Sequence, residues 1–236
     1  MVGHLNKGKS FLKSLIFTGN WNYENMQGSG FRYLLEEIDH ANDLGMDHNQ
    51  LSRQTEYFNT HPFLVTFVLG VWFKEFIREG QPDYFKKVYS SALAALGDSF
   101  FWHSLRPISF IIAALFGLVH PVLGVVMYLL VFNFFHFIFL YIGFDMGYVL
   151  GKEVISWFNR IKFNKWSAYS DFITSFLLGV LLSLGLKEYG METVTYYFFA
   201  TCFLLVGFFI AKKLDVLFSL IIAIIACLVM LYVKGG

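Results

Sequence analysis

The sequence predicts an all-α polytopic membrane protein with about five transmembrane helices, short or re-entrant helical hairpins and a small N-terminal helical region. Hydrophobic residues make up 56% of the 236 residues and charged residues 15%, whereas soluble domains carry about 25% charged residues. The mean hydropathy is +0.56. Apolar runs approaching the roughly 20 residues needed to cross a bilayer recur through the second half of the chain.

Residues 1–60 differ from the rest because polar and apolar residues alternate there without a long apolar run. Helix-like patterns begin at residues 33–38 and 51–58, and residues 41–49 are turn-prone. We expect a small helical region in the cytoplasm or on the membrane surface. The first apolar stretch, residues 11–17, contains Lys13 and lacks a small-residue cleavage site, so no cleavable signal peptide is expected.

Residues 61–96 are predicted to form a hairpin of short helices that enters the membrane without crossing it. The apolar run at residues 63–73 is shorter than a span and fits a re-entrant, interfacial or buried segment. Pro62 suits the start of a helix. A charged segment at 74–87 and a run rich in small residues at 88–96 complete the hairpin.

Residues 97–236 are predicted to form the transmembrane domain, whose first two spans make a hairpin around His120 and Pro121. Basic residues gather at 74–87, at 152–165 and at 212–213, which all fall on one side of the membrane if five spans cross it. This arrangement places the N-terminal region inside and the C-terminus outside. The five expected spans are residues 99–119, 121–142, 172–186, 194–211 and 214–233.

Asp98 and Arg106 flank and enter the first apolar run, where a charge costs about 2.5–3.5 kcal/mol and is rarely present without a use. Pro107 lacks a backbone donor and is predicted to break the helix there. The two charges either form an internal ion pair or contact a polar substrate or a partner subunit. His103 shares the face of Arg106 and is either a hydrogen-bonded core residue or a ligand.

Two further polar groups interrupt apolar sequence. Asn59 and His61 precede the short run at 63–73. Either Asn59 or Thr60 caps the following helix, or Asn59 and His61 line a polar path. Asn133 and His136 form a polar stripe in the second span, which serves either interhelical hydrogen bonds or the same path.

Glycines at 143, 147 and 151 recur every four residues after the second span and favour close helix packing, with a face left for a partner subunit. The two cysteines, Cys202 and Cys227, lie in apolar runs without metal-ligand spacing and are interpreted as small hydrophobic residues. There is no histidine pair or zinc motif, no phosphate-binding loop and no nucleophile elbow, so we expect no metal, cofactor or catalytic residue. The net charge of +1, without a long basic block, gives no sign of nucleic-acid binding.

Several motifs follow one another along the chain. The longest are residues 20–27 (NWNYENMQ), 58–62 (FNTHP), 97–102 (GDSFFW) and 105–107 (LRP). Phe132 and Asn133 with His136 come next, followed by the residues around the glycines named above. With these motifs the chain resembles the IID subunit of the mannose/fructose/sorbose family of the bacterial sugar phosphotransferase system.

This resemblance implies an α-helical, multi-pass transport subunit in the bacterial cytoplasmic membrane, paired with a IIC subunit. The two subunits would move a hexose-type sugar that cytoplasmic IIA and IIB units phosphorylate, so no phosphoryl-carrying residue is expected here. The alternatives are a non-transporting structural or receptor-like subunit of the same family and, with less support, a membrane-embedded enzyme. The candidate residues of the sugar path are Asn59, His61, Asp98, His103, Arg106, Asn133 and His136.

Overall fold

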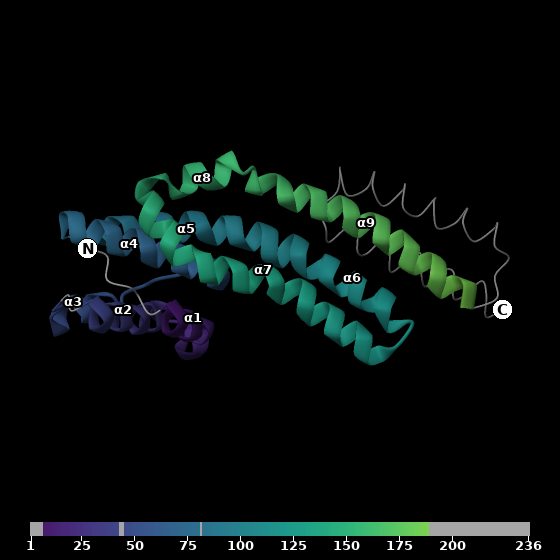
Figure 1. The fold of residues 1–236 in the computed structure, drawn as a ribbon, viewed down its shortest axis with the longest axis horizontal. Coiled ribbons are helices and arrows are strands. Elements are labelled where there is room, and N and C mark those ends of the chain that lie inside the picture. Colours follow the sequence, from purple (N-terminus) through teal and green to yellow (C-terminus); the bar gives the residue numbers. More distant parts are fainter. Residues whose placement is uncertain (1–6, 43–44, 81, 189–236) are drawn as a thin grey trace. The chain divides into compact units, whose positions relative to one another are not determined.

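The computed structural model describes residues 7–42, 45–80 and 82–188, and in these residues the chain is helical apart from turns and two isolated β-bridges (Figure 1). The chain divides into two compact units, Met1–Asp171 and Phe172–Gly236. Helix α9 (Phe163–Glu188) begins in the first unit and supplies the described part of the second. The expected span at 172–186 lies within α9, whereas those at 194–211 and 214–233 lie outside the described residues.

The N-terminal region contains helices α1 (Lys7–Leu15), α2 (Gly28–Asn42) and α3 (His48–Arg53), with a 3-10 turn, η1 (Phe17–Asn20), after α1. Helix α3 begins with a capping box, because the Asp47 carboxylate accepts from the Gln50 backbone N–H and the Gln50 side chain accepts from the Asp47 N–H. Helix α2 buries one apolar face with helical spacing: Phe31, Leu34, Leu35 and Ile38.

Helix α4 (Val65–Glu79) is the central element of the first unit. A 3-10 turn, η2 (Pro62–Leu64), leads into it, and every residue from 63 to 73 is buried. A helix that is apolar on all sides is typical of a protein core. Helix α4 packs most extensively against α7 (Pro121–Leu150) and also against α5 (Asp83–Gly97). The short apolar run is thus buried against the other helices of this unit.

Glycines allow α4 and α7 to approach closely. A Cβ at Gly147 would lie 2.3 Å from the Phe67 carbonyl oxygen, and one at Gly143 would lie 2.1 Å from Thr66 Oγ1. The contact is reciprocal, because a Cβ at Gly70 would lie 2.3 Å from the Phe144 carbonyl oxygen. The predicted packing role of these glycines is therefore confirmed, but their partner is α4 of the same chain. The expectation that this ridge is left for a partner subunit is wrong for its first two glycines.

The helix does not break at Pro107, which corrects the sequence prediction. Helix α5 runs on through a π-helical stretch, η3 (Asp98–Leu105), into α6 (Arg106–Gly117), and the Arg106 N–H bonds to the Phe101 carbonyl. In an ordinary α-helix the Pro107 ring would clash with the carbonyl four residues earlier. The wider π turn before the proline relieves this clash, so residues 83–117 form one continuous helical rod.

Helices α6 and α7 form the hairpin expected around His120 and Pro121, with Pro121 in the first turn of α7. A Cβ at Gly124 would lie 2.6 Å from the Ala113 carbonyl oxygen, so the two helices touch near the turn. Beyond α7 lie a 3-10 turn, η4 (Gly151–Glu153), and α8 (Val154–Arg160).

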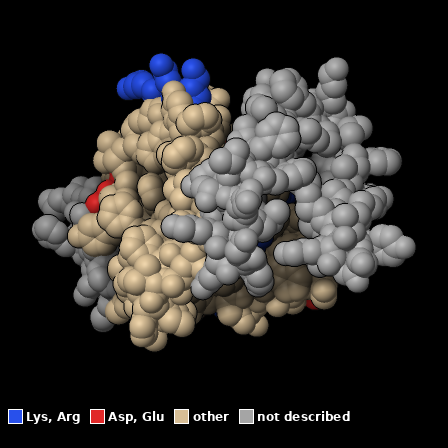
Figure 2. All heavy atoms as spheres, turned by 90° about the vertical axis from the view of Figure 1, so that its right-hand side faces the viewer, with Lys and Arg blue, Asp and Glu red and all other residues tan. Residues whose placement is uncertain are grey.

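Two helical stretches of the described residues are long and apolar enough to cross a membrane, namely Asp83–Gly117 and Pro121–Leu181. The described surface seen in Figure 2 consists mostly of uncharged residues, with Lys or Arg atoms at its upper edge and a few Asp or Glu atoms at its sides.

Candidate functional site

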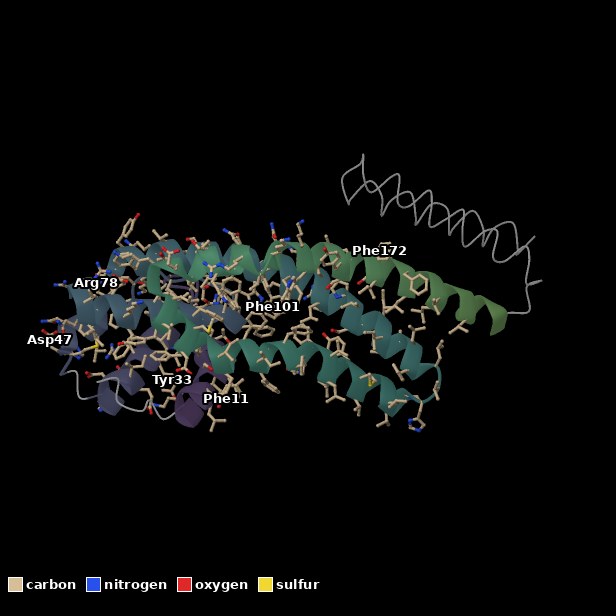
Figure 3. The ribbon with its side chains drawn as sticks, turned by 45° about the horizontal axis from the view of Figure 1, so that its top comes forward. Phe11, Tyr33, Asp47, Arg78, Phe101 and Phe172 are labelled. Carbon is tan, nitrogen blue, oxygen red and sulfur yellow. The ribbon has the colours of Figure 1, made fainter. Side chains whose placement is uncertain are left out.

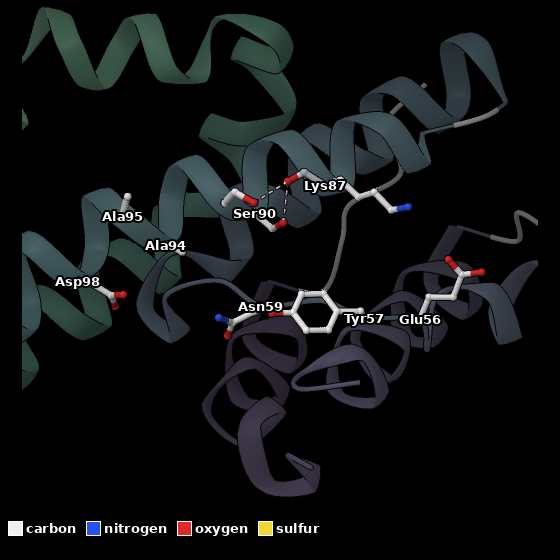
Figure 4. Close-up of a pocket in the computed structure, with 9 residues that line it drawn as sticks. Glu56, Tyr57, Asn59, Lys87, Ser90, Ala94, Ala95 and Asp98 are labelled. Atoms are coloured by element: carbon white, nitrogen blue, oxygen red, sulfur yellow. Dashed lines mark hydrogen bonds between the residues drawn. The ribbon is translucent and has the colours of Figure 1, made fainter. Parts of the chain in front are cut away.

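A pocket of about 630 Å³ lies between α5 and the segment that precedes η2 (Figure 4). The wall from α5 and η3 repeats at helical spacing, since positions 87, 90/91, 94/95 and 98 share one face. Chain segments about forty residues apart in sequence thus build one site. The pocket is lined by Glu56, Tyr57, Asn59, Lys87, Ser90, Ser91, Ala94, Ala95 and Asp98.

Two of the predicted residues, Asn59 and Asp98, face this pocket from opposite walls (Figure 4). Asn59 is exposed and Asp98 is half-buried. Within the described part of the chain, neither side chain makes a hydrogen bond or an ion pair. The hydroxyls of Ser90 and Ser91 both donate to the Lys87 carbonyl, at 3.0 and 3.1 Å, and keep lone pairs that can accept. The pocket therefore presents amide, carboxylate and hydroxyl groups.

His61 lies behind the pocket wall and is 1% exposed. Its ring stacks on Phe101 at 4.7 Å between centroids, and Gly97 presses against it so closely that a Cβ there would lie 2.3 Å from the His61 Cβ. Its Nδ1 accepts the Phe63 N–H at 3.2 Å, so His61 caps η2. The prediction that Asn59 or Thr60 supplies this cap is therefore wrong.

The buried imidazole of His61 is held in its neutral form. Burial, and to a lesser extent the nearby His136, lowers the pKa of His61 to about 3. Because Nδ1 accepts a hydrogen bond, the proton of the neutral ring lies on Nε2, which is buried without a partner. The environment of His61 is thus that of a packed aromatic ring.

His136 belongs to the same aromatic cluster, because its ring stacks on Phe63 at 3.7 Å. The Asn133 amide nitrogen donates to the Leu129 carbonyl at 2.9 Å, and its oxygen lies 3.4 Å from His136 Nδ1. The stripe of Asn133 and His136 is therefore hydrogen-bonded within α7. The two polar groups considered for one path are divided, with Asn59 in the pocket, His61 and His136 packed against Phe63, and Asn133 hydrogen-bonded within α7.

Asp98 and Arg106 do not form the ion pair considered in the sequence analysis. They lie eight residues apart on an unbroken helix, at the two ends of its π-helical stretch. The Arg106 guanidinium instead lies over the Trp102 ring at 5.5 Å from its centroid. His103 and Arg106 are both exposed and lie away from the pocket lining.

Several pocket residues escaped the sequence analysis. Lys87, Ser90 and Ser91 share a face with Asp98, and this spacing was the available signal. The sequence gives no signal for Glu56 and Tyr57, because only the packing of their segment against α5 brings them to the site.

The sequence analysis also missed two buried charged residues, Lys86 and Glu75. Each contacts a residue from another segment of the chain. Lys86 Nζ donates to the Gln54 carbonyl at 2.9 Å and lies over the Phe31 and Phe58 rings at 5.0 and 5.5 Å. Glu75 is 1% exposed and lies 3.6 Å from Lys152 Nζ.

The sequence profile described as the PTS system mannose/fructose/sorbose family IID component matches residues 5–234 of this chain. The chain belongs to this family. The IID chain is 26% identical over 186 residues to the mannose-specific EIID component of Escherichia coli K12, a match that covers 73% of this chain and 65% of the relative. It thus spans just under two thirds of that relative's length.

Two further relatives show similar levels of identity. The Bacillus subtilis fructose permease IID component is 26% identical over 183 residues, covering 73% of this chain and 66% of the relative. The Klebsiella pneumoniae sorbose-specific EIID component is 26% identical over 183 residues, covering 73% of this chain and 67% of the relative.

Solved structures share the fold of the IID chain. One membrane protein matches with a TM-score of 0.71 and 21% identity, over 99% of this chain and 98% of the other. A chain in the structure of the mannose transporter ManYZ with a microcin matches with a TM-score of 0.58 and 20% identity. The match covers 100% of this chain and 98% of the other.

Proposed function

We propose that this IID chain is a membrane subunit of a phosphotransferase-system sugar permease. With a IIC subunit it forms the path for a hexose-type sugar, which cytoplasmic IIA and IIB units phosphorylate on entry. The family and the apolar helices support this proposal. In this scheme the chain has no phosphoryl-carrying residue and acts by binding and guiding the sugar.

The observation that carries the proposal is the pair of unengaged polar side chains, Asn59 and Asp98, on opposite walls of one pocket. A sugar presents hydroxyl groups that both donate and accept, and an amide beside a carboxylate matches this chemistry. Both side chains are accessible from the pocket and have no partner in the described part of the chain, so a ligand can reach their polar atoms. The Asp98 carboxylate accepts from hydroxyl groups, and Asn59 supplies both a donor and an acceptor.

The proposed placement is the bacterial cytoplasmic membrane, with about five spans and a cytoplasmic N-terminal region. The hairpin of residues 61–96 enters the bilayer from the cytoplasmic side only at its ends near Phe63 and Gly97, without crossing it. The helix that begins with α5 continues through η3 and α6 across the bilayer. This placement is supported by the basic residues at 152–165 and 74–87, which the orientation rule assigns to the cytoplasm.

The IIC subunit is proposed to cover the face that carries His103 and Arg106. Both side chains are exposed on a helix that is apolar enough to cross a membrane. A charge at that depth should face protein or water and avoid lipid. The glycine ridge at 143 and 147 is occupied by α4 and is not available for this contact.

The test is uptake of mannose, fructose and sorbose per assembled complex in Asn59→Leu. Its matched control is Asn49→Leu, the same change at an exposed position on α3 outside the pocket. Loss of uptake at normal protein level in Asn59→Leu alone supports the proposal. Unchanged uptake removes the pocket from the sugar path, and a wild-type complex that takes up no sugar favours a non-transporting subunit.

A further inference from the structure

The exposed surface of the N-terminal region is strongly polarised. Around α1 and η1 it carries large apolar side chains, since Leu12 is 62%, Ile16 62% and Tyr23 86% exposed, beside the polar Asn20 and Glu24. The exposed residues of α2 and α3 are polar or charged instead: His40, His48, Asn49, Gln50 and Arg53. A helix with one buried and one exposed apolar edge needs a second apolar environment to cover it.

Helix α1 lies at a defined level along α7. The Phe11 ring meets those of Phe137 and Tyr141 edge-on, with centroids 6.0 and 6.3 Å apart, and Figure 3 shows Phe11 beside α7. Residues 121–144 carry no Asp, Glu, Lys or Arg, and Asp145 is the first charged residue of α7. A span of about 20 residues that begins at Pro121 ends near the contact with Phe11. Helix α1 therefore sits where α7 leaves the apolar layer.

The opposite end of the N-terminal region lies farther from that layer. Asp47, at the start of α3, and Arg78, in the last turn of α4, lie at the end of the first unit remote from the α6–α7 turn (Figure 3). The exposed aliphatic side chains of this region, Leu12, Leu15 and Ile16, thus lie on α1, at the end that faces the span.

The apolar surface of α1 continues that of α7, where Phe134 and Ile138 are exposed beside the Phe11 contact. Trp21 and Tyr23 are both exposed and contact each other at 4.8 Å, and these two residue types are enriched at membrane interfaces. Lys13 pairs with Glu37 and lies over the Tyr33 ring, which fixes α1 to α2. By sequence, α1 contains three lysines and no acidic residue.

We propose that α1, together with Trp21 and Tyr23, is an interfacial anchor that lies in the headgroup region of an anionic bilayer. Leu12 and Ile16 enter the boundary of the acyl chains, and the basic character of α1 selects anionic lipid. This anchor holds the pocket segment at the membrane surface, because α1 and α2 pack together and the Gln27 side chain, just before α2, accepts the Thr60 N–H at 2.9 Å. The proposal requires α7 to cross the membrane but does not require sugar transport.

The test uses the full chain in nanodiscs, with Cys202→Ala and Cys227→Ala as background. A fluorophore is attached at Leu12→Cys or, in a second variant, at Ile16→Cys, and quenching by phosphatidylcholine brominated near the carboxyl end of its acyl chains is measured. Asn49→Cys on α3 is the matched exposed control. We expect strong quenching at both α1 positions and only background quenching at Asn49.

The charge dependence is tested with the same labels, in nanodiscs with and without phosphatidylglycerol. Quenching on α1 should rise with the anionic lipid, and Lys7→Gln with Lys9→Gln should reduce this rise, since each lysine near such a surface favours it about fivefold. Quenching at α1 equal to that at Asn49 would overturn the proposal. Labels that are buried but unquenched would also overturn it and would assign this face to a partner protein. Quenching that does not depend on phosphatidylglycerol would overturn it as well.

Discussion

The pocket at Asn59 and Asp98 and the aromatic cluster at His61, Phe63 and His136 share the wall formed by residues 97–101, yet their polar groups have opposite environments. In the pocket Asn59 and Asp98 are accessible and make no hydrogen bond or ion pair within the described part of the chain. In the cluster the imidazoles are stacked on Phe101 and Phe63 and contribute as rings. Gly97 separates the two, since its backbone touches His61 and the next residue, Asp98, lines the pocket.

This difference shows that a polar residue in an apolar run has no single meaning. A neutral histidine packs like an aromatic ring when its nitrogens are capped or buried, whereas a carboxylate without a partner remains available to a ligand. Changes in the cluster should therefore reduce stability first. Changes in the pocket should reduce transport at normal protein level.

The largest expected effect is that of Phe63→Ala. Phe63 is 7% exposed and contacts both histidines, so its truncation should cost about 3–5 kcal/mol. We expect a lower thermal midpoint in detergent and lower membrane abundance. Phe110→Ala, at a phenylalanine that is 67% exposed, is the matched control and should change both much less. Equal abundance of Phe63→Ala and wild type would contradict a packing role for the cluster.

The second-largest effect is expected for Asp98→Ala, which should reduce sugar uptake. Loss of one polar partner to a buried hydroxyl costs about 1–3 kcal/mol, which corresponds to roughly a 5–150-fold loss of uptake per assembled complex. Abundance should stay near the wild-type level, because Asp98 makes no ion pair that its removal would break. Glu153→Ala, at an exposed carboxylate outside the pocket, serves as control. Lost abundance with unchanged uptake per complex would place Asp98 with the cluster.

The lowered pKa of His61 predicts a pH effect on stability. Between about pH 6.5 and about pH 3 the unfolded chain binds a proton at this position and the folded chain does not. Stability should therefore fall as the pH is lowered through this range, by about 2 kcal/mol near pH 5. Nitrogen NMR of labelled histidine, with His61→Gln to identify the signal, should show a neutral ring near pH 5. A protonated His61 in folded protein at that pH would exclude the buried environment.

The smallest expected effect concerns Arg106. Its contact with Trp102 is worth about 0.5–1 kcal/mol, so Arg106→Gln should lower stability slightly and Arg106→Lys less. Because no ion pair joins Arg106 to Asp98, the double change with Asp98→Asn should show additive effects on abundance. Recovery of abundance in the double variant would restore the ion-pair interpretation.

Sequence reasoning found the helices and the α6–α7 hairpin because apolar length and Pro121 are local signals. It failed at Pro107, because the π-helical stretch before the proline accommodates its ring without breaking the helix. Whether such a stretch forms depends on the helices on both sides of it. The cap of η2 was also missed, because His61 is an unusual acceptor. The pocket itself could not be predicted, since it exists only where residues 56–59 meet α5. Asn59 and Asp98 were nevertheless both named as candidates from their polarity alone.

The most direct measurement is protection of the pocket by sugar. In the Cys202→Ala and Cys227→Ala background, Ala95→Cys places a thiol on the pocket wall, and Ser156→Cys on α8 places one at an exposed control site. The rate of maleimide labelling in the assembled complex is measured with and without mannose, fructose or sorbose. We predict that one of these sugars slows labelling at Ala95→Cys and leaves Ser156→Cys unchanged. If a sugar that the same complex transports leaves the rate at Ala95→Cys unchanged, the sugar path does not pass through this pocket.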